Sequence, residues 1–163
     1  MFYIPLTGIY TRSMYHLLLF IHSLMRWLVL ASLVAAIFRA GKGLRSGAPF
    51  TATDNSFRHW TATIAHIQLM AGCMLYFTSP LIKLFFSGIK AGEMWFFGLV
   101  HLSLMVAAIV VITIGSALAK RRVAAKDKFR TMLTWFSTAL LIIFIAIPWP
   151  FSPFAGRPLL RSF

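Results

Sequence analysis

Four long apolar runs constrain most strongly what this chain can fold into. They cover about residues 14–38, 57–78, 94–119 and 131–147, and each approaches or exceeds the roughly 20 helical residues that cross the hydrocarbon core of a bilayer. Hydrophobic residues make up 60% of the 163-residue chain, and the mean hydropathy is +0.82. A soluble domain of this size could not bury that much apolar surface. The sequence therefore predicts an integral membrane protein.

Short links separate the four runs, and they predict how the helices are arranged. Glycine and proline in residues 40–49 are expected to end the first helix, residues 79–80 to end the second, and the Pro-Trp-Pro motif at 148–150 to end the fourth. Residues 81–92 are expected to lie at the membrane surface. Because short links force neighbouring helices to run antiparallel, we predict an all-α, up-and-down four-helix bundle that forms a single domain over residues 1–163.

The charged residues predict an orientation for the bundle. The chain has 16 Lys and Arg against 3 Asp and Glu, a formal net charge of +13. The basic residues gather in the first and third links rather than along one surface, which is typical of cytoplasmic membrane loops and not of a nucleic-acid-binding protein. The positive-inside rule then puts both termini on the outer, periplasmic side of a bacterial inner (cytoplasmic) membrane.

Two histidines lie at matching depths in the first and third runs. His22 is about eight residues below the outer end of its helix and His101 about seven, so both should lie roughly 11–12 Å deep at 1.5 Å per residue. These two helices should be diagonal in a four-helix bundle. Inward-facing imidazoles at one level could ligate a haem iron between them. The alternative is two unrelated histidines, each hydrogen-bonded to a hydroxyl or carbonyl.

Arg26 follows His22 by one helical turn and should face the same interior. An ionisable residue at this depth is a functional-site hypothesis by default. No acidic residue lies deep in any run, so Arg26 needs an anionic group such as a haem propionate, or a quinone carbonyl. The alternative partners are the hydroxyls and carbonyls of the fourth helix, where Thr131, Thr134 and Thr138 form a stripe expected to face inward.

The second run carries a further stripe with helical spacing, which includes His66, Met70 and Cys73. His66 should lie only several Å from the level of His22 and is a third candidate for cofactor binding. It could replace one of the iron ligands, serve a second group or contact a quinone. The three side chains also offer the soft donors that Cu(I) prefers, although Met and Cys on an inward face are more often core residues.

Several motifs resemble a family of small bacterial four-helix membrane proteins labelled cytochrome b or cytochrome b-like. The resemblance covers roughly residues 15–151 and depends on four motifs in order: HSLMRWLVL, AHIQLMAGCMLYFTSP, VHLSLMVAAIVVITIGSALAKR and DKFRTMLTWFSTALLIIFIAIPWPF. It implies a helical bundle with haem-binding histidines. The motif positions that it marks are His22, Arg26, Trp27, His66, Gln68, His101 and the Pro-Trp-Pro exit.

The sequence thus predicts a b-type haem protein that transfers electrons within the membrane, with quinone as a candidate partner. His22 and His101 are the predicted metal ligands, and Arg26 and His66 complete the predicted cofactor-binding set. The alternative is a non-catalytic accessory subunit of a larger respiratory membrane complex, without its own haem. With three acidic residues in the whole chain, catalysis by paired carboxylates is disfavoured. An electron-transfer or accessory protein is therefore favoured over a self-sufficient enzyme.

Overall fold

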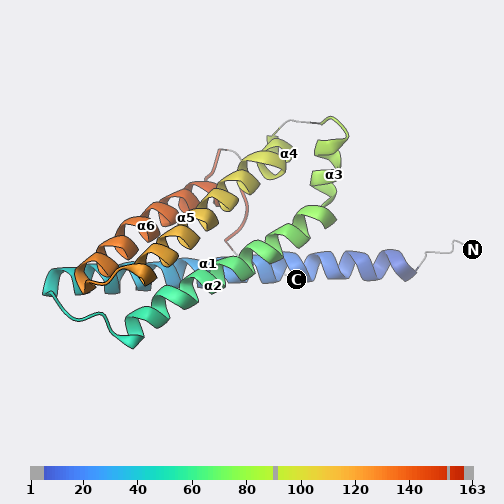
Figure 1. Ribbon diagram of the computed structural model, residues 1–163. Helices are drawn as coiled ribbons and strands as arrows, with labels where there is room; N and C mark the ends of the chain where they lie inside the picture. The colour runs from blue at the N-terminus through green and yellow to red at the C-terminus, as the bar shows by residue number, and fades with distance from the viewer. Residues whose placement is uncertain (1–5, 90–91, 154, 160–163) are drawn as a thin grey trace, which may run out of the picture.

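The computed structural model describes residues 6–89, 92–153 and 155–159, with side chains from residue 13 onward. This described part of the chain is helical and contains no β-strand (Figure 1). Its elements are α1 (Leu6–Ser46), α2 (Ala52–Thr78), α3 (Pro80–Phe86), α4 (Gly92–Trp95), the π-helical turn η1 (Phe96–Val100), α5 (His101–Arg121) and α6 (Ala125–Ala146). The predicted all-helical fold class is confirmed.

The four long helices pack in a closed order. α1 contacts α2 and α6, and α5 contacts the same two helices, so α1 and α5 occupy opposite corners of the bundle. α4, η1 and α5 follow one another without a break and form a single long helical segment, Gly92–Arg121. The α5–α6 and α1–α2 links lie together at one end of the molecule (Figure 1).

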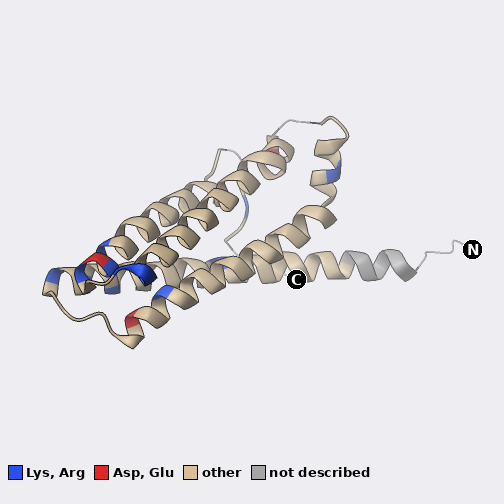
Figure 2. Cartoon of the chain, viewed as in Figure 1, with Lys and Arg blue, Asp and Glu red and all other residues tan. Residues whose placement is uncertain are grey.

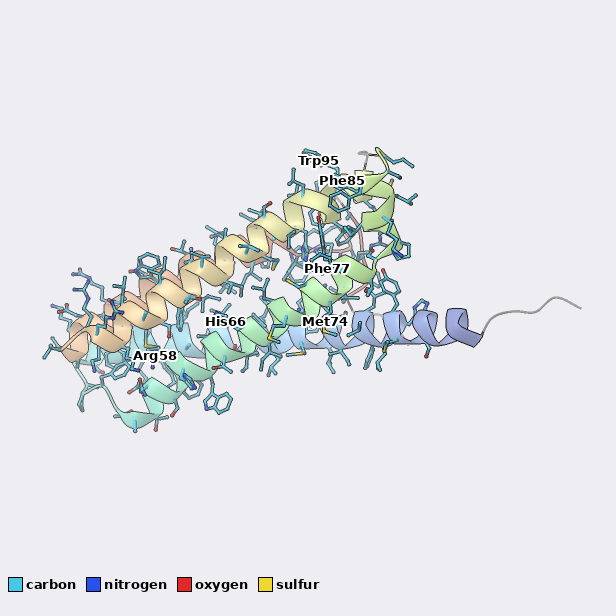
Figure 3. All side chains as sticks on the ribbon, turned by 45° about the vertical axis from the view of Figure 1, so that its right-hand side comes forward. Arg58, His66, Met74, Phe77, Phe85 and Trp95 are labelled. Carbon is cyan, nitrogen blue, oxygen red and sulfur yellow. The ribbon has the colours of Figure 1, made fainter. Side chains whose placement is uncertain are left out.

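Several helices are long and apolar enough to cross a membrane. The segments Ser13–Ser46, Gly92–Arg121 and Ala125–Ala146 each meet this condition alone, and α2 with α3 forms a fourth candidate span that is bent by 62°. Large apolar side chains cover the outer surface, among them Phe77 with 80% exposure and Met74 with 55% (Figure 3). An exterior of this kind is suited to lipid. The prediction of a multi-pass membrane protein is confirmed.

Close packing is concentrated in the half of the bundle nearest the α1–α2 and α5–α6 links. There the four helices share one buried cluster that contains many alanines, including Ala36, Ala40, Ala65, Ala108 and Ala139. Small side chains let membrane helices approach closely. Most lysines and arginines lie at this same end of the molecule (Figure 2).

The opposite half of the bundle is open. α2 diverges from α5 there, and α3 turns back toward α4 to cover the end (Figure 1). Gly98 of η1 makes this contact possible, because a Cβ at that position would lie 2.5 Å from the ring of Phe85. The Tyr76 hydroxyl donates a hydrogen bond to the Gly98 carbonyl, 2.9 Å away. The divergence leaves a space inside the bundle.

Two sequence-based expectations about α1 and α6 were wrong. The first helix does not end near Gly41 but continues to Ser46, and Gly47, with φ of 64°, follows its end. Gly43 is buried because the ring of Phe129 packs directly on its backbone. In α6, the stripe of threonines does not face inward as a whole, because Thr134 and Thr138 are exposed.

Candidate cofactor cavity

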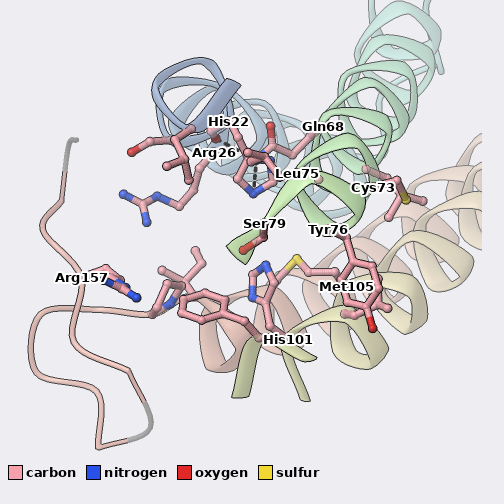
Figure 4. A pocket seen from close by; sticks show the side chains of 18 of the residues that line it. His22, Arg26, Gln68, Cys73, Leu75, Tyr76, Ser79, His101, Met105 and Arg157 are labelled. Carbon is pink, nitrogen blue, oxygen red and sulfur yellow. Dashed lines mark hydrogen bonds between the residues drawn. The ribbon is translucent and has the colours of Figure 1, made fainter. Parts of the chain in front are cut away.

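A cavity of about 460 Å³ occupies the open half of the bundle (Figure 4). Every long helix contributes to its wall, together with α3 and the segment that follows α6. Its wall is mostly aliphatic, and the polar or charged side chains that interrupt it include His22, Arg26, Gln68, Glu93, His101 and Arg157. A cavity of this size with few polar groups is typical of a small-molecule or cofactor site.

His22 and His101 enter this cavity from opposite sides. His22 comes from α1 and His101 from the first residue of α5, and their rings point toward one another across the space (Figure 4). The diagonal placement of α1 and α5 produces this arrangement, since side chains on the inner faces of diagonal helices meet at the bundle axis.

The end of α6 fixes the orientation of His101. Its Nδ1 donates a hydrogen bond to the Ala146 carbonyl, 2.8 Å away. That carbonyl is available because α6 ends at Ala146, and the last carbonyls of a helix have no partner within it. Pro148, four positions after Phe144, has no N–H to donate to the Phe144 carbonyl, and the indole Nε1 of Trp149 donates to it instead at 2.8 Å. With Nδ1 protonated, the Nε2 of a neutral His101 keeps its lone pair free.

His22 is held less firmly, by Gln68 and Gly72 of α2. The Gln68 amide donates to the His22 carbonyl at 2.9 Å and lies 3.4 Å from the ring Nε2. A Cβ on Gly72 would lie 3.1 Å from the His22 ring, so the missing side chain provides the space for the imidazole. The Nδ1 of His22 and the Oε1 of Gln68 are both buried without a hydrogen-bond partner.

Arg26 contacts the C-terminal segment instead of the α6 hydroxyls considered from the sequence. Its guanidinium donates to the Leu159 carbonyl, which also accepts from the Trp27 indole at 3.2 Å. The same segment brings Arg157 to the cavity, where it forms an ion pair with Glu93. The Nε atoms of both arginines are buried and have no partner.

His66 does not line the cavity with the other three predicted residues. Its Nδ1 donates to the Ala62 carbonyl at 2.7 Å, and its Nε2 lies 3.1 Å from the Thr113 hydroxyl. His66 and Met70 are exposed on the outside of α2, whereas Cys73 lines the cavity. The stripe therefore divides between two surfaces. Among the described residues, no group of three or more His, Cys, Asp or Glu could hold a metal ion.

Sequence reasoning missed several residues that line the cavity, among them Gly72, Glu93 and Arg157. Glu93 and Arg157 lie 64 positions apart in the chain, and the segment after α6 has no periodicity that would place it against α1 or α4. The one available signal was Arg157 itself, a charged residue soon after an apolar helix.

Comparison with known proteins provides no independent assignment. No family model, no curated protein and no solved structure matches the chain at a significant level.

Proposed function

We propose that this protein binds a b-type haem and takes part in electron transfer within the membrane. One observation carries the proposal: His22 and His101 point toward one another across one cavity of the bundle, from diagonal helices. A haem iron receives four nitrogen ligands from its porphyrin, so the protein needs to supply only one or two more. Paired imidazoles are suited to this role.

Other features of the cavity agree with a haem. Its volume of about 460 Å³ lies within the range of roughly 300–1,000 Å³ that is usual for ligand sites. The aliphatic wall would shield a macrocycle from water, and the guanidiniums of Arg26 and Arg157 on that wall agree with a ligand that carries acidic groups. When bound, the haem iron would supply one-electron chemistry by cycling between its ferric and ferrous states.

The residues of the chain would hold and tune that group. The Ala146 carbonyl keeps the Nδ1 of His101 protonated and its Nε2 free to ligate, which is the usual arrangement behind a metal-bound histidine. Gln68 lies at 3.4 Å from the Nε2 of His22, a weak contact that ligation would replace. Arg26 would attract the acidic groups of the haem.

The membrane placement is part of the same proposal. We place the protein in a bacterial inner membrane, with α2 and α3 as one bent span and the basic α1–α2 and α5–α6 links in the cytoplasm. The cavity then lies in the outer half of the bilayer. A quinone dissolved in the lipid is the proposed redox partner, because it could reach a cavity within the membrane without crossing an aqueous phase.

Absorption spectroscopy of the purified protein tests the proposal. Protein expressed with ample haem should show a Soret band and, after reduction by dithionite, a sharp α-band typical of b-type haem. His22→Ala and His101→Ala should each remove most of the bound haem. His66→Ala is the matched control and should retain it, since His66 lies outside the cavity.

Two results would contradict this assignment. Wild-type protein without Soret absorption would exclude haem binding and favour the accessory-subunit alternative. Loss of haem in His66→Ala with retention in His22→Ala would show that the ligand pair is wrong.

A further inference from the structure

The segment after α6 closes one side of the cavity. It leaves the end of α6 and runs back to α1 (Figure 1). Two contacts hold it: the Leu159 carbonyl accepts hydrogen bonds from Arg26 and Trp27 of α1, and Arg157 forms an ion pair with Glu93 of α4. The segment therefore connects two helices that diverge in this half of the bundle.

This segment places a second arginine beside the same cavity as Arg26. Both guanidiniums lie on one side of the space (Figure 4). Each rests near an aromatic ring, Arg26 at 5.5 Å from the Trp27 centroid and Arg157 at 5.3 Å from that of Phe97. Aromatic contacts of this kind fix the plane of a guanidinium while leaving its N–H groups available.

The charges at this side of the cavity are not balanced. Among the described lining residues, Glu93 has the only carboxylate, against the two guanidiniums of Arg26 and Arg157. The Nε of each arginine is also buried without a partner. One net positive charge with unused donors is costly inside a membrane protein unless an anion is present.

We propose that Arg26 and Arg157 together form an acid-binding end of the cavity, which holds the carboxylate groups of the bound ligand. This inference rests on the proposed function, in which those carboxylates are the two haem propionates. A ferric haem with both propionates ionised has one net negative charge and would neutralise the charge described above. The C-terminal segment is then part of the binding site, because it supplies Arg157.

Haem and its dimethyl ester provide a direct test with the wild-type protein. The ester has the same macrocycle and iron but lacks the two propionate charges. In titrations of haem-free protein, haem should bind on the order of tenfold or more tightly than the ester, since charge-assisted hydrogen bonds contribute at least this much. Equal binding of the two compounds would overturn the inference and leave the proposed function standing.

Variants of the two arginines test whether their guanidiniums cause the preference for haem over the ester. Arg26→Gln and Arg157→Gln should each reduce the preference for haem over the ester, and Arg157→Lys should restore part of it. Arg130→Gln is the matched control, because Arg130 is exposed near the start of α6, and the cavity lies at the other end of that helix. An unchanged preference in both glutamine variants would also overturn the inference.

The reduction potential of bound haem gives a second readout that does not depend on affinity. Ferrous haem has one more negative charge than ferric haem, so a nearby cation favours the reduced state. Arg157→Gln should lower the midpoint potential, Arg157→Lys should lower it less, and Glu93→Gln should raise it. Failure of both haem and ester to bind wild-type protein would contradict the proposed function and this inference together.

Discussion

The two cavity histidines are held in place differently: a hydrogen bond fixes His101, whereas neighbouring residues of α2 position His22. His101 is fixed by a hydrogen bond to the Ala146 carbonyl, which is free because α6 ends there. His22 has no comparable anchor at Nδ1, and its ring is placed by Gln68 and by the space above Gly72. The geometry at His22 should therefore be the more sensitive to single substitutions on its neighbours.

Gly72→Ala tests this sensitivity with the addition of one methyl group. The new Cβ would lie 3.1 Å from the Cε1 of His22, so the ring would have to move by a few tenths of an ångström. We expect lower haem affinity and a changed α-band, measured on reduced purified protein. Gly41→Ala is the matched control, because its Cβ would meet its nearest neighbour at 3.9 Å. Identical spectra for both variants would contradict the role assigned to Gly72.

At the scale of helices, the apolar runs were predictable from the sequence but some of their ends were not. The predicted first run stopped near residue 38, whereas α1 continues to Ser46. Glycine both interrupts helices and permits close helix contacts, and the sequence alone does not distinguish these uses. Gly43 permits a close helix contact, because Phe129, which is far away in the sequence, packs on it.

The candidate site was predictable to a similar extent. The position of each residue along its helix predicted that His22 and His101 lie at the same depth, and both residues line the cavity. Periodicity grouped His66 with Cys73, but it could not show that the inner face of α2 centres on Ala65, Gln68 and Gly72. The contribution of Arg157 depends on the path of an irregular segment, which no local pattern specifies.

Gly43→Ala tests the helix contact between α1 and α6. A Cβ at Gly43 would come within 2.4 Å of the Phe129 ring, which is 2% exposed and packs against Phe50 at 5.0 Å, so it has no room to move. Overpacking of this kind costs about 1–3 kcal/mol. Thermal unfolding of the protein in detergent, followed by circular dichroism, should show a clear loss of stability.

Gly41→Ala, two positions earlier in α1, is the control for this measurement. It adds the same methyl group with 3.9 Å of space, and replacing glycine within a helix should stabilise the protein by up to about 1 kcal/mol. Equal stability of the two variants would show that α1 and α6 are not in close contact at Gly43.

At the scale of the whole molecule, the close-packed half of the bundle is also the half that carries most of the charged side chains (Figure 2). The half next to the basic links has the alanine-rich core, and the other half has the cavity. The charged end contains Arg39, whose guanidinium forms an ion pair with the buried Asp54 at 2.7 Å. A close-packed half anchored at one membrane surface can support an open half at the other, where a cofactor could bind without loss of the fold.

The proposed orientation can be tested with single cysteines at the two ends of the bundle. Ser46, at the end of α1, and Ser87, after α3, are both exposed and lie at opposite ends. Cys73, the single native cysteine, would first be replaced by alanine to remove background labelling. Because basic links remain in the cytoplasm, a membrane-impermeant maleimide added to spheroplasts should label Ser87→Cys and should label Ser46→Cys only after the membrane is permeabilised. The reverse pattern would invert the topology, and it would place the cavity in the cytoplasmic half of the bilayer.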